Sequence, residues 1–247
     1  MRVLSIIHQP DAASGVFGDA VRERGHELDE WDISRSPDPP APIELYGAVL
    51  VFGGAMHADQ EVRHGWLRDE NALLQRLLAD GVPTFGVCLG GQLLAKALDA
   101  PVRRMPSSEV GWFDVDLTPE AADDPVFGGL SERFKAFQWH SYHFELPDGG
   151  VPLARNDRCL QGFRAGTAWG IQFHPEVTPE DLAEWLRTAD PVEDGPIDIE
   201  ALRAESDELI AGWNAFGRDL CGRFLAVAED AGVRRPDATT RATSPRS

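Results

Sequence analysis

The sequence predicts an α/β protein with three layers, in which helices flank a central sheet of mixed, mostly parallel strands. The first observation is an alternation of apolar runs with stretches of helical periodicity through residues 2–98, which is typical of a helix-covered parallel sheet. The second is a change of pattern after residue 109. There, short strand-like runs are joined by Gly, Asp and Pro turns, so we expect antiparallel additions to the sheet.

Turn and helix-end signals bound each element predicted in the first half of the chain. Gly25 ends the first helix, Asp80 and Gly81 end the second, and a proline-rich loop over residues 36–42 follows the second strand. We therefore expect strands at Arg2–His8, Glu27–Ile33, Ala48–Phe52 and Val82–Val87, and helices at Gly15–Arg24, Trp66–Leu78 and Gly91–Leu98.

The second half is expected to add short strands and one capped helix. A threonine at the cap, a proline at the first position and acids in the first turn start a helix at Thr178, which runs to about Arg187. The expected strands are Val110–Leu117, Phe134–Gln138, Val151–Ala154, Cys159–Arg164 and Thr167–Phe173.

These elements form one predicted domain over residues 1–189. We expect residues 190–231 to be a linker and an amphipathic helix, and residues 232–247 to be a disordered tail. Three glycines lower the helix's intrinsic stability, so tertiary packing must hold it. Packing on its own domain is favoured, and a homo-oligomer contact is the alternative. The apolar face carries Leu202, Leu209, Trp213, Phe216, Leu220, Phe224 and Val227.

Composition excludes several classes of protein. The 247 residues carry 41 acidic and 23 basic side chains, a formal net charge of −18, which argues against a nucleic-acid-binding surface. Cys88, Cys159 and Cys221 are too few and too scattered for a disulfide framework. No apolar run reaches membrane-spanning length, and the first strand is too short for a signal peptide. We therefore expect no membrane partner and a reducing cytoplasmic location.

No metal and no other cofactor is expected. His140 and His143 are close in sequence, but no carboxylate or cysteine stands at ligand spacing beside them. The sequence also lacks a Walker-type phosphate loop, so it does not encode an ATP-using synthetase.

The sequence Gly86-Val87-Cys88-Leu89-Gly90 is a cysteine version of the strand–turn–helix nucleophile elbow. The two glycines allow close approach of strand and helix, and Cys88 is exposed at the carboxyl edge of the sheet. The N-terminus of the following helix favours a thiolate. The backbone N–H of Leu89 can donate to a developing oxyanion. A buried structural cysteine is the alternative interpretation.

A second motif, His174-Pro175-Glu176, follows an apolar strand. Proline keeps His174 extended, so His174 and Glu176 lie on one side of the backbone and Glu176 can orient the imidazole. Cys88, His174 and Glu176 together therefore predict a nucleophile, a base and its orienting acid.

The two motifs resemble the class I glutamine amidotransferase family, whose pattern joins G-x-C-x-G-x-Q to a distant H-P-E. The resemblance covers about residues 3–186 and is to stand-alone members and the glutaminase domain of GMP synthase. It implies that family's flavodoxin-like fold and a second oxyanion N–H from Gly54. It also implies that Gln92 and the backbone of Ser141 and Tyr142 hold the glutamyl end of a substrate.

Two departures from the family pattern bear on the substrate. Ala55 follows Gly54 where family members usually have proline, and Ser141-Tyr142 replaces the glycine–aspartate of some relatives. We expect a cysteine-dependent amidohydrolase that cleaves glutamine or a γ-glutamyl compound through a γ-glutamyl thioester. The alternatives are a glutaminase that delivers ammonia to a separate synthetase partner, and a catalytically silent binding or regulatory module.

Overall fold

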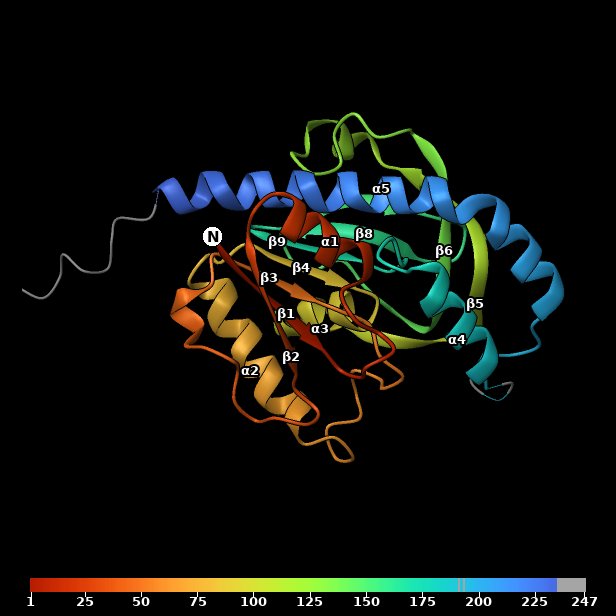
Figure 1. The fold of residues 1–247 in the computed structure, drawn as a ribbon, viewed down its shortest axis with the longest axis horizontal. Coiled ribbons are helices and arrows are strands. Elements are labelled where there is room, and N and C mark those ends of the chain that lie inside the picture. The colour runs from red at the N-terminus through yellow and green to blue at the C-terminus, as the bar shows by residue number, and fades with distance from the viewer. Residues whose placement is uncertain (191, 193, 235–247) are drawn as a thin grey trace, which may run out of the picture.

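The computed structural model describes residues 1–190, 192 and 194–234, and Figure 1 shows its elements. The strands are β1 (Arg2–Ile7), β2 (Glu27–Asp32), β3 (Ala48–Val51), β4 (Thr84–Val87), β5 (Val102–Leu117), β6 (Arg133–Phe144), β7 (Val151–Arg155), β8 (Leu160–Ala165) and β9 (Ala168–Ile171). The helices are α1 (Gly15–Glu23), α2 (Trp66–Ala79), α3 (Leu89–Ala97), α4 (Pro179–Thr188) and α5 (Ile199–Arg234), with short 3₁₀ helices η1 (Ile43–Leu45) and η2 (Pro119–Asp123).

Over the described residues the strands form one nine-stranded sheet in the order β2-β1-β3-β4-β9-β8-β7-β5-β6. The run from β2 to β9 is parallel, and the pairings from β9 to β6 are antiparallel. The predicted mixed sheet with flanking helices is confirmed. All four residues of β4 are buried between β3 and β9, so the end of β4 lies at the centre of the sheet's carboxyl edge.

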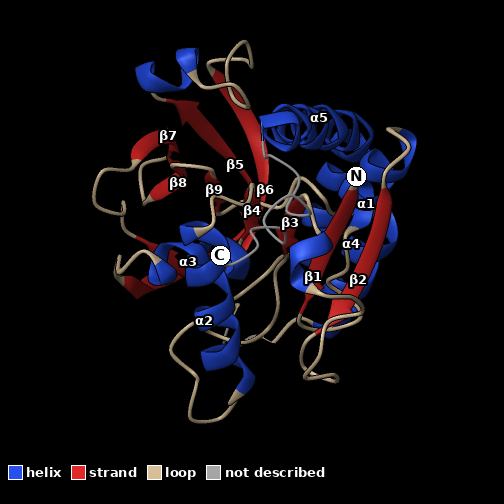
Figure 2. Ribbon diagram, turned by 90° about the vertical axis from the view of Figure 1, so that its left-hand side faces the viewer, coloured by secondary structure: helices blue, strands red, loops and turns tan. Residues whose placement is uncertain are grey.

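Helices cover both faces of the sheet, and each face has its own hydrophobic core (Figure 2). One core joins the sheet to α1, α4 and α5, and the other joins it to α2 and α3. The predicted cap of α4 is confirmed, because the Thr178 side chain accepts a hydrogen bond from the Asp181 N–H. None of the helices in the described ranges is both long and apolar enough to cross a membrane.

The hairpin of β5 and β6 is longer than the sequence predicted. We expected strands at Val110–Leu117 and Phe134–Gln138, whereas β5 begins at Val102 and β6 continues to Phe144. The added part of β5 is largely polar and half of its residues are exposed, so it lacks the alternation that marks a half-buried strand. Its register shifts between Arg104 and Glu109, which further hides the pattern.

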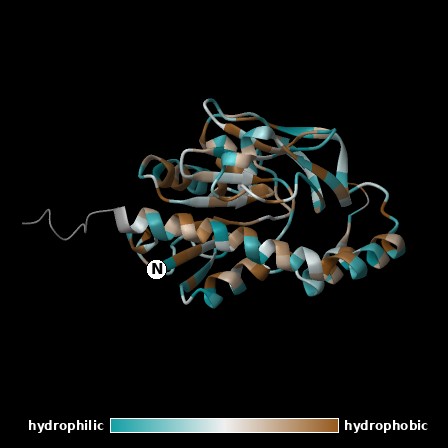
Figure 3. Ribbon diagram, turned by 90° about the horizontal axis from the view of Figure 1, so that it is seen from above, coloured by the Kyte–Doolittle hydropathy of each residue, from teal (hydrophilic) through white to brown (hydrophobic). Residues whose placement is uncertain are grey.

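The C-terminal amphipathic segment forms a single helix, α5, which lies across the domain next to α1 (Figure 1). Apolar residues recur along it with polar residues between them (Figure 3). Trp213, Leu220 and Phe224 of the predicted face are buried against the same chain. The predicted disordered tail over residues 232–247 lies outside the described residues from 235 onward.

Candidate active site

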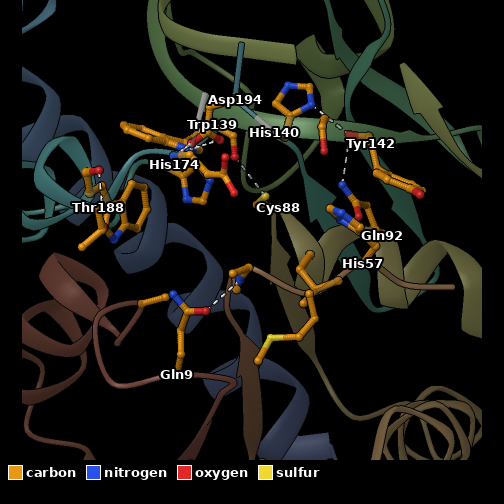
Figure 4. Close-up of a pocket in the computed structure, with 18 of the residues that line it drawn as sticks. Gln9, His57, Cys88, Gln92, Trp139, His140, Tyr142, His174, Thr188 and Asp194 are labelled. Atoms are coloured by element: carbon orange, nitrogen blue, oxygen red, sulfur yellow. Dashed lines mark hydrogen bonds between the residues drawn. The ribbon is translucent and has the colours of Figure 1, made fainter. Parts of the chain in front are cut away.

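The carboxyl edge of the parallel strands carries a cavity of about 320 Å³ (Figure 4). Cys88 follows β4, Gly54 follows β3 and His174 follows β9, and all three line the cavity. Parallel strands bring their carboxyl ends to one edge, which is why residues far apart in the sequence meet here. Gln92, Ser141 and Tyr142 also line the cavity, whereas Glu176 lies behind His174.

Cys88 sits at a strained turn between β4 and α3. Its backbone has φ 53° and ψ −110°, a conformation that non-glycine residues rarely adopt, and it is the residue that directly precedes α3. A side chain on Gly90 would place its Cβ 2.1 Å from the carbonyl oxygen of Val51, and one on Gly86 would meet the backbone of Gly90 at 2.5 Å. The glycines of the motif therefore permit the close strand–helix contact that the sequence predicted.

His174 and Glu176 form a buried pair. Nδ1 of His174 lies 2.8 Å from Oε1 of Glu176, and both side chains are almost fully buried. Burial disfavours the charged imidazole, but Glu176 and Cys88 outweigh it and hold the pKa of His174 well above its ordinary value. Nε2 of His174 is buried and makes no hydrogen bond in the structure, and the Cys88 thiol is directed at the carbonyl oxygen of Trp139 at 3.8 Å.

The turn after β3 brings two glycines against the catalytic candidates. A Cβ on Gly53 would lie 3.1 Å from Cε1 of His174 and 3.8 Å from Cβ of Cys88, so a side chain there would crowd both. A Cβ on Gly54 would lie 3.4 Å from the Leu89 side chain. The two predicted oxyanion donors, Gly54 and Leu89, are thus neighbours, and both line the cavity with Cys88. The N–H of Ala55, the residue that follows Gly54, donates to Gln9 Oε1 at 2.7 Å.

Gln92 and Tyr142 meet on the other wall of the cavity. Nε2 of Gln92 donates to the carbonyl oxygen of Tyr142 at 3.0 Å and to Gln172 Oε1 at 3.3 Å. The Tyr142 ring stacks on His57 with 4.3 Å between centroids, and its hydroxyl donates to Asp59 at 3.3 Å. Tyr142, one of the residues that depart from the family pattern, therefore contacts the loop after Ala55 through this stacked pair.

Comparison with known proteins identifies the group to which this fold and site belong. The model of the family described as "Glutamine amidotransferase class-I" matches residues 16–188, well over half of the chain. The chain belongs to the class I glutamine amidotransferase family. The resemblance predicted from the two motifs is therefore confirmed.

The chain covers different shares of the individual relatives that it matches. A γ-glutamyl-L-1-hydroxyisopropylamide hydrolase from a Pseudomonas species is 33% identical over 168 residues, which is 62% of this chain and 56% of the hydrolase. A glutamine-hydrolysing GMP synthase subunit from Halobacterium salinarum is 32% identical over 158 residues, 62% of this chain and 78% of that protein. The crystal structure of a glutamine amidotransferase from Thermotoga maritima matches with a TM-score of 0.83 and 31% identity, over 91% of this chain and 98% of that one.

Helix α5, which lies beyond the matched family region, supports the His-Pro-Glu loop. The Trp213 indole donates to the carbonyl oxygen of His174 at 2.7 Å, and the Asn214 amide donates to that of Val177 at 2.7 Å. A Cβ on Gly217 would lie 2.1 Å from the Pro175 carbonyl oxygen. Sequence reasoning missed these contacts, because the apolar stripe of α5 predicts burial but not its partner.

Glu109, His140 and Cys159 form a second polar cluster next to the cavity. The sequence argument against a metal site assumed that no carboxylate or cysteine lies beside His140, and this assumption is wrong. The fold brings Glu109 and Cys159 to His140, although neither stands near it in sequence. His140 Nε2 is 3.0 Å from Glu109 Oε2, and its Nδ1 donates to the Tyr142 carbonyl at 2.9 Å. The absence of a metal stays a prediction. Two amides, those of Asn156 at 2.7 Å and Gln161 at 3.2 Å, already donate to the Glu109 carboxylate.

Proposed function

We propose that this amidotransferase family member is a cysteine-dependent amidohydrolase of γ-glutamyl amides. The observation that carries the proposal is Cys88 at a strained elbow before α3, in one cavity with His174 of the buried His174–Glu176 pair. A helix N-terminus and a neighbouring imidazolium both favour a thiolate. This arrangement suits attack on a carbonyl carbon.

The mechanism has two steps. The Cys88 sulfur attacks the side-chain amide carbon, forming a tetrahedral oxyanion that the N–H groups of Gly54 and Leu89 stabilise. The C–N bond then breaks as His174 gives a proton to the leaving nitrogen, which releases ammonia or an amine and leaves a γ-glutamyl thioester. In the second step His174 takes a proton from water, the resulting hydroxide attacks the thioester, and the γ-carboxylate departs from the Cys88 thiolate. Glu176 orients the imidazole throughout and exchanges no proton itself.

The two walls of the cavity suit the two ends of such a substrate. We assign Gln92, Ser141 and Tyr142 to the glutamyl end. Trp139 and His174 lie on the opposite side of Cys88 from Gln92 and Tyr142 (Figure 4). The ring of Trp185, which also lines the cavity, is 4.9 Å from that of His174 and 5.8 Å from that of Trp139. Because His174 protonates the leaving nitrogen, we expect the leaving amine to lie on that side, against the two indoles.

An amine larger than ammonia therefore fits the indole side of the cavity. The similarity to a γ-glutamyl-L-1-hydroxyisopropylamide hydrolase supports this reading. The similarity to a glutamine-hydrolysing GMP synthase subunit supports the second candidate function, a glutaminase that delivers ammonia to a separate synthetase. The two candidates share the chemistry at Cys88 and differ in the leaving group and in the need for a partner.

The purified chain should cleave a γ-glutamyl alkylamide without a partner, with a higher kcat/KM than glutamine. The physical reason is that the indoles can bury an apolar leaving group, which is worth about 0.8 kcal/mol per CH₂, or roughly fourfold in kcat/KM. The measurement compares glutamine with γ-glutamyl methyl-, ethyl- and isopropylamide. A preference for glutamine, or activity that appears only with an added synthetase, would favour the partner-dependent glutaminase. No turnover under any condition would favour the silent module.

Glu176→Gln should lower kcat by about 10²-fold, and His174→Ala by about 10⁴-fold or more. Glu176 helps to raise the pKa of His174, so the proton-donating imidazolium persists below that raised pKa and is lost as pH rises through it. Without the carboxylate, the alkaline fall of kcat/KM should move to lower pH. The pH profiles of both variants test this, with melting temperature as the control. If Glu176→Gln left kcat and the pH profile unchanged, Cys88 and His174 would act as a dyad without an orienting acid.

A further inference from the structure

A buried histidine outside the predicted triad contacts the turn after β3. His8 follows β1, and its Nδ1 lies 3.0 Å from the carbonyl oxygen of Gly53. Its Nε2 lies 3.0 and 3.1 Å from the two carboxylate oxygens of Glu70 on α2. Both side chains are fully buried, and the imidazole stacks on Trp66 with 5.4 Å between ring centroids. The orientation of this ring is therefore determined on three sides.

The contacts of His8 define the direction of its hydrogen bonds. A carbonyl oxygen accepts only, so Nδ1 must carry a proton and donate it to Gly53. The Glu70 carboxylate then holds the ring's second proton at Nε2. Burial opposes the charged ring, but Glu70 and the backbone carbonyls of Gly53 and Phe52 raise the pKa of His8 above its ordinary value. The His8–Glu70 pair thus keeps a donor aimed at the Gly53 carbonyl.

Holding that carbonyl also determines the direction of the next amide. The described chain has no cis peptide bond, and in a planar trans peptide the C=O and the following N–H point in opposite directions. The N–H of Gly54 therefore points away from His8, and Gly54 lines the cavity beside Cys88. Two adjacent glycines offer little resistance to rotation of the peptide between them, so an external contact is needed to hold it.

We propose that His8 and Glu70 are positioning residues that hold the Gly53–Gly54 peptide with its N–H directed at the oxyanion formed on Cys88. Neither side chain touches the substrate. The inference rests on the proposed function, because it concerns the oxyanion of that reaction. It assigns the pair a role in the chemical step rather than in substrate binding.

The test compares two double variants that differ only at position 8. Both carry Glu70→Met, which avoids leaving a buried carboxylate without its partner. His8→Leu then removes the donor to Gly53, whereas His8→Asn keeps one, because the amide nitrogen of asparagine is attached to Cγ as Nδ1 of histidine is. The readouts are kcat and KM for the best γ-glutamyl amide, the rate of Cys88 alkylation by iodoacetamide, and the melting temperature.

The His8→Leu double variant should lose about 10²- to 10³-fold in kcat, the effect of removing one oxyanion donor, with KM changed less than about threefold. Its alkylation rate should stay within about threefold of the unsubstituted chain, because attack on iodoacetamide needs the thiolate but forms no oxyanion. The His8→Asn double variant should recover about tenfold or more of kcat. A loss of kcat without a loss of alkylation rate would not arise from a general disordering of the site, which would lower both.

Several outcomes would overturn the inference. Parallel loss of kcat and alkylation would give the pair a structural role only, and an unchanged kcat with His8→Leu would show that the peptide is held by other contacts. If the His8→Leu chain does not fold, Glu70→Met alone decides, because it removes the carboxylate that orients the His8 ring. Its kcat should fall by about tenfold or more while alkylation of Cys88 stays within about threefold, and an unchanged kcat, or a parallel fall of kcat and alkylation, would overturn the inference. No turnover by the unsubstituted chain would instead refute the proposed function, and this inference with it.

Discussion

Cys88→Ala should lower the hydrolysis of γ-glutamyl amides by about 10⁴-fold or more, as removal of a nucleophile does in other triads. The substitution removes one sulfur atom from a turn whose backbone is held by the close β4–α3 contact, so the melting temperature should change little. Activity and thermal unfolding measured on the same preparation check both parts. Retention of a tenth of the activity would exclude Cys88 as the nucleophile.

The other two cysteines provide the internal control. Burial and the Glu109 carboxylate raise the pKa of Cys159 to about 12, and burial raises the pKa of Cys221 further. Both therefore remain protonated near neutral pH and should react slowly with iodoacetamide. Mass spectrometry of the briefly labelled folded chain should find the label on Cys88. Equal labelling of the three thiols would contradict an activated thiolate at Cys88.

Removal of α5 by truncation after Asp190 should abolish folding at moderate temperature. The helix buries five large apolar side chains, and roughly 1.5–3 kcal/mol each gives a loss comparable with the whole stability of a typical domain. We expect aggregation and loss of the cooperative unfolding transition in calorimetry. A soluble monomer derived from an oligomer would instead make α5 an interface between copies of the chain. The five side chains are Leu202, Trp213, Leu220, Phe224 and Leu225.

Substitutions at two glycines of α5 can distinguish its support of the active site from its contribution to stability. Gly217→Ala would place a methyl group 2.1 Å from the Pro175 carbonyl oxygen, whereas Gly212→Ala would meet nothing within 4 Å. Both substitutions raise helix propensity by about 1 kcal/mol. Gly212→Ala should therefore be neutral or stabilising with normal kcat, and Gly217→Ala should displace the His174–Glu176 loop and lower kcat. Equal behaviour of the two variants would refute the supporting role of α5.

The catalytic candidates that lie in short motifs could be predicted from the sequence. The elbow around Cys88 and the His174-Pro175-Glu176 motif depend on local backbone geometry, which Gly and Pro define at short range. The alternation of strands and helices in the first half is a similar short-range signal, and it predicted the parallel part of the sheet. The long hairpin of β5 and β6 was only partly predicted, because the polar first half of β5 carries no apolar alternation.

The sequence by itself thus determined the fold class, the family and the candidate nucleophile, base and orienting acid. Only the tertiary structure decided what supports them: His8 and Glu70 behind the Gly53–Gly54 peptide, and Trp213 of α5 behind His174. These partners are 45, 62 and 39 positions apart in the chain. A contact at such separation leaves no periodic or local pattern, because it arises where packed strands and helices happen to place two side chains, so it appears only once the elements are assembled.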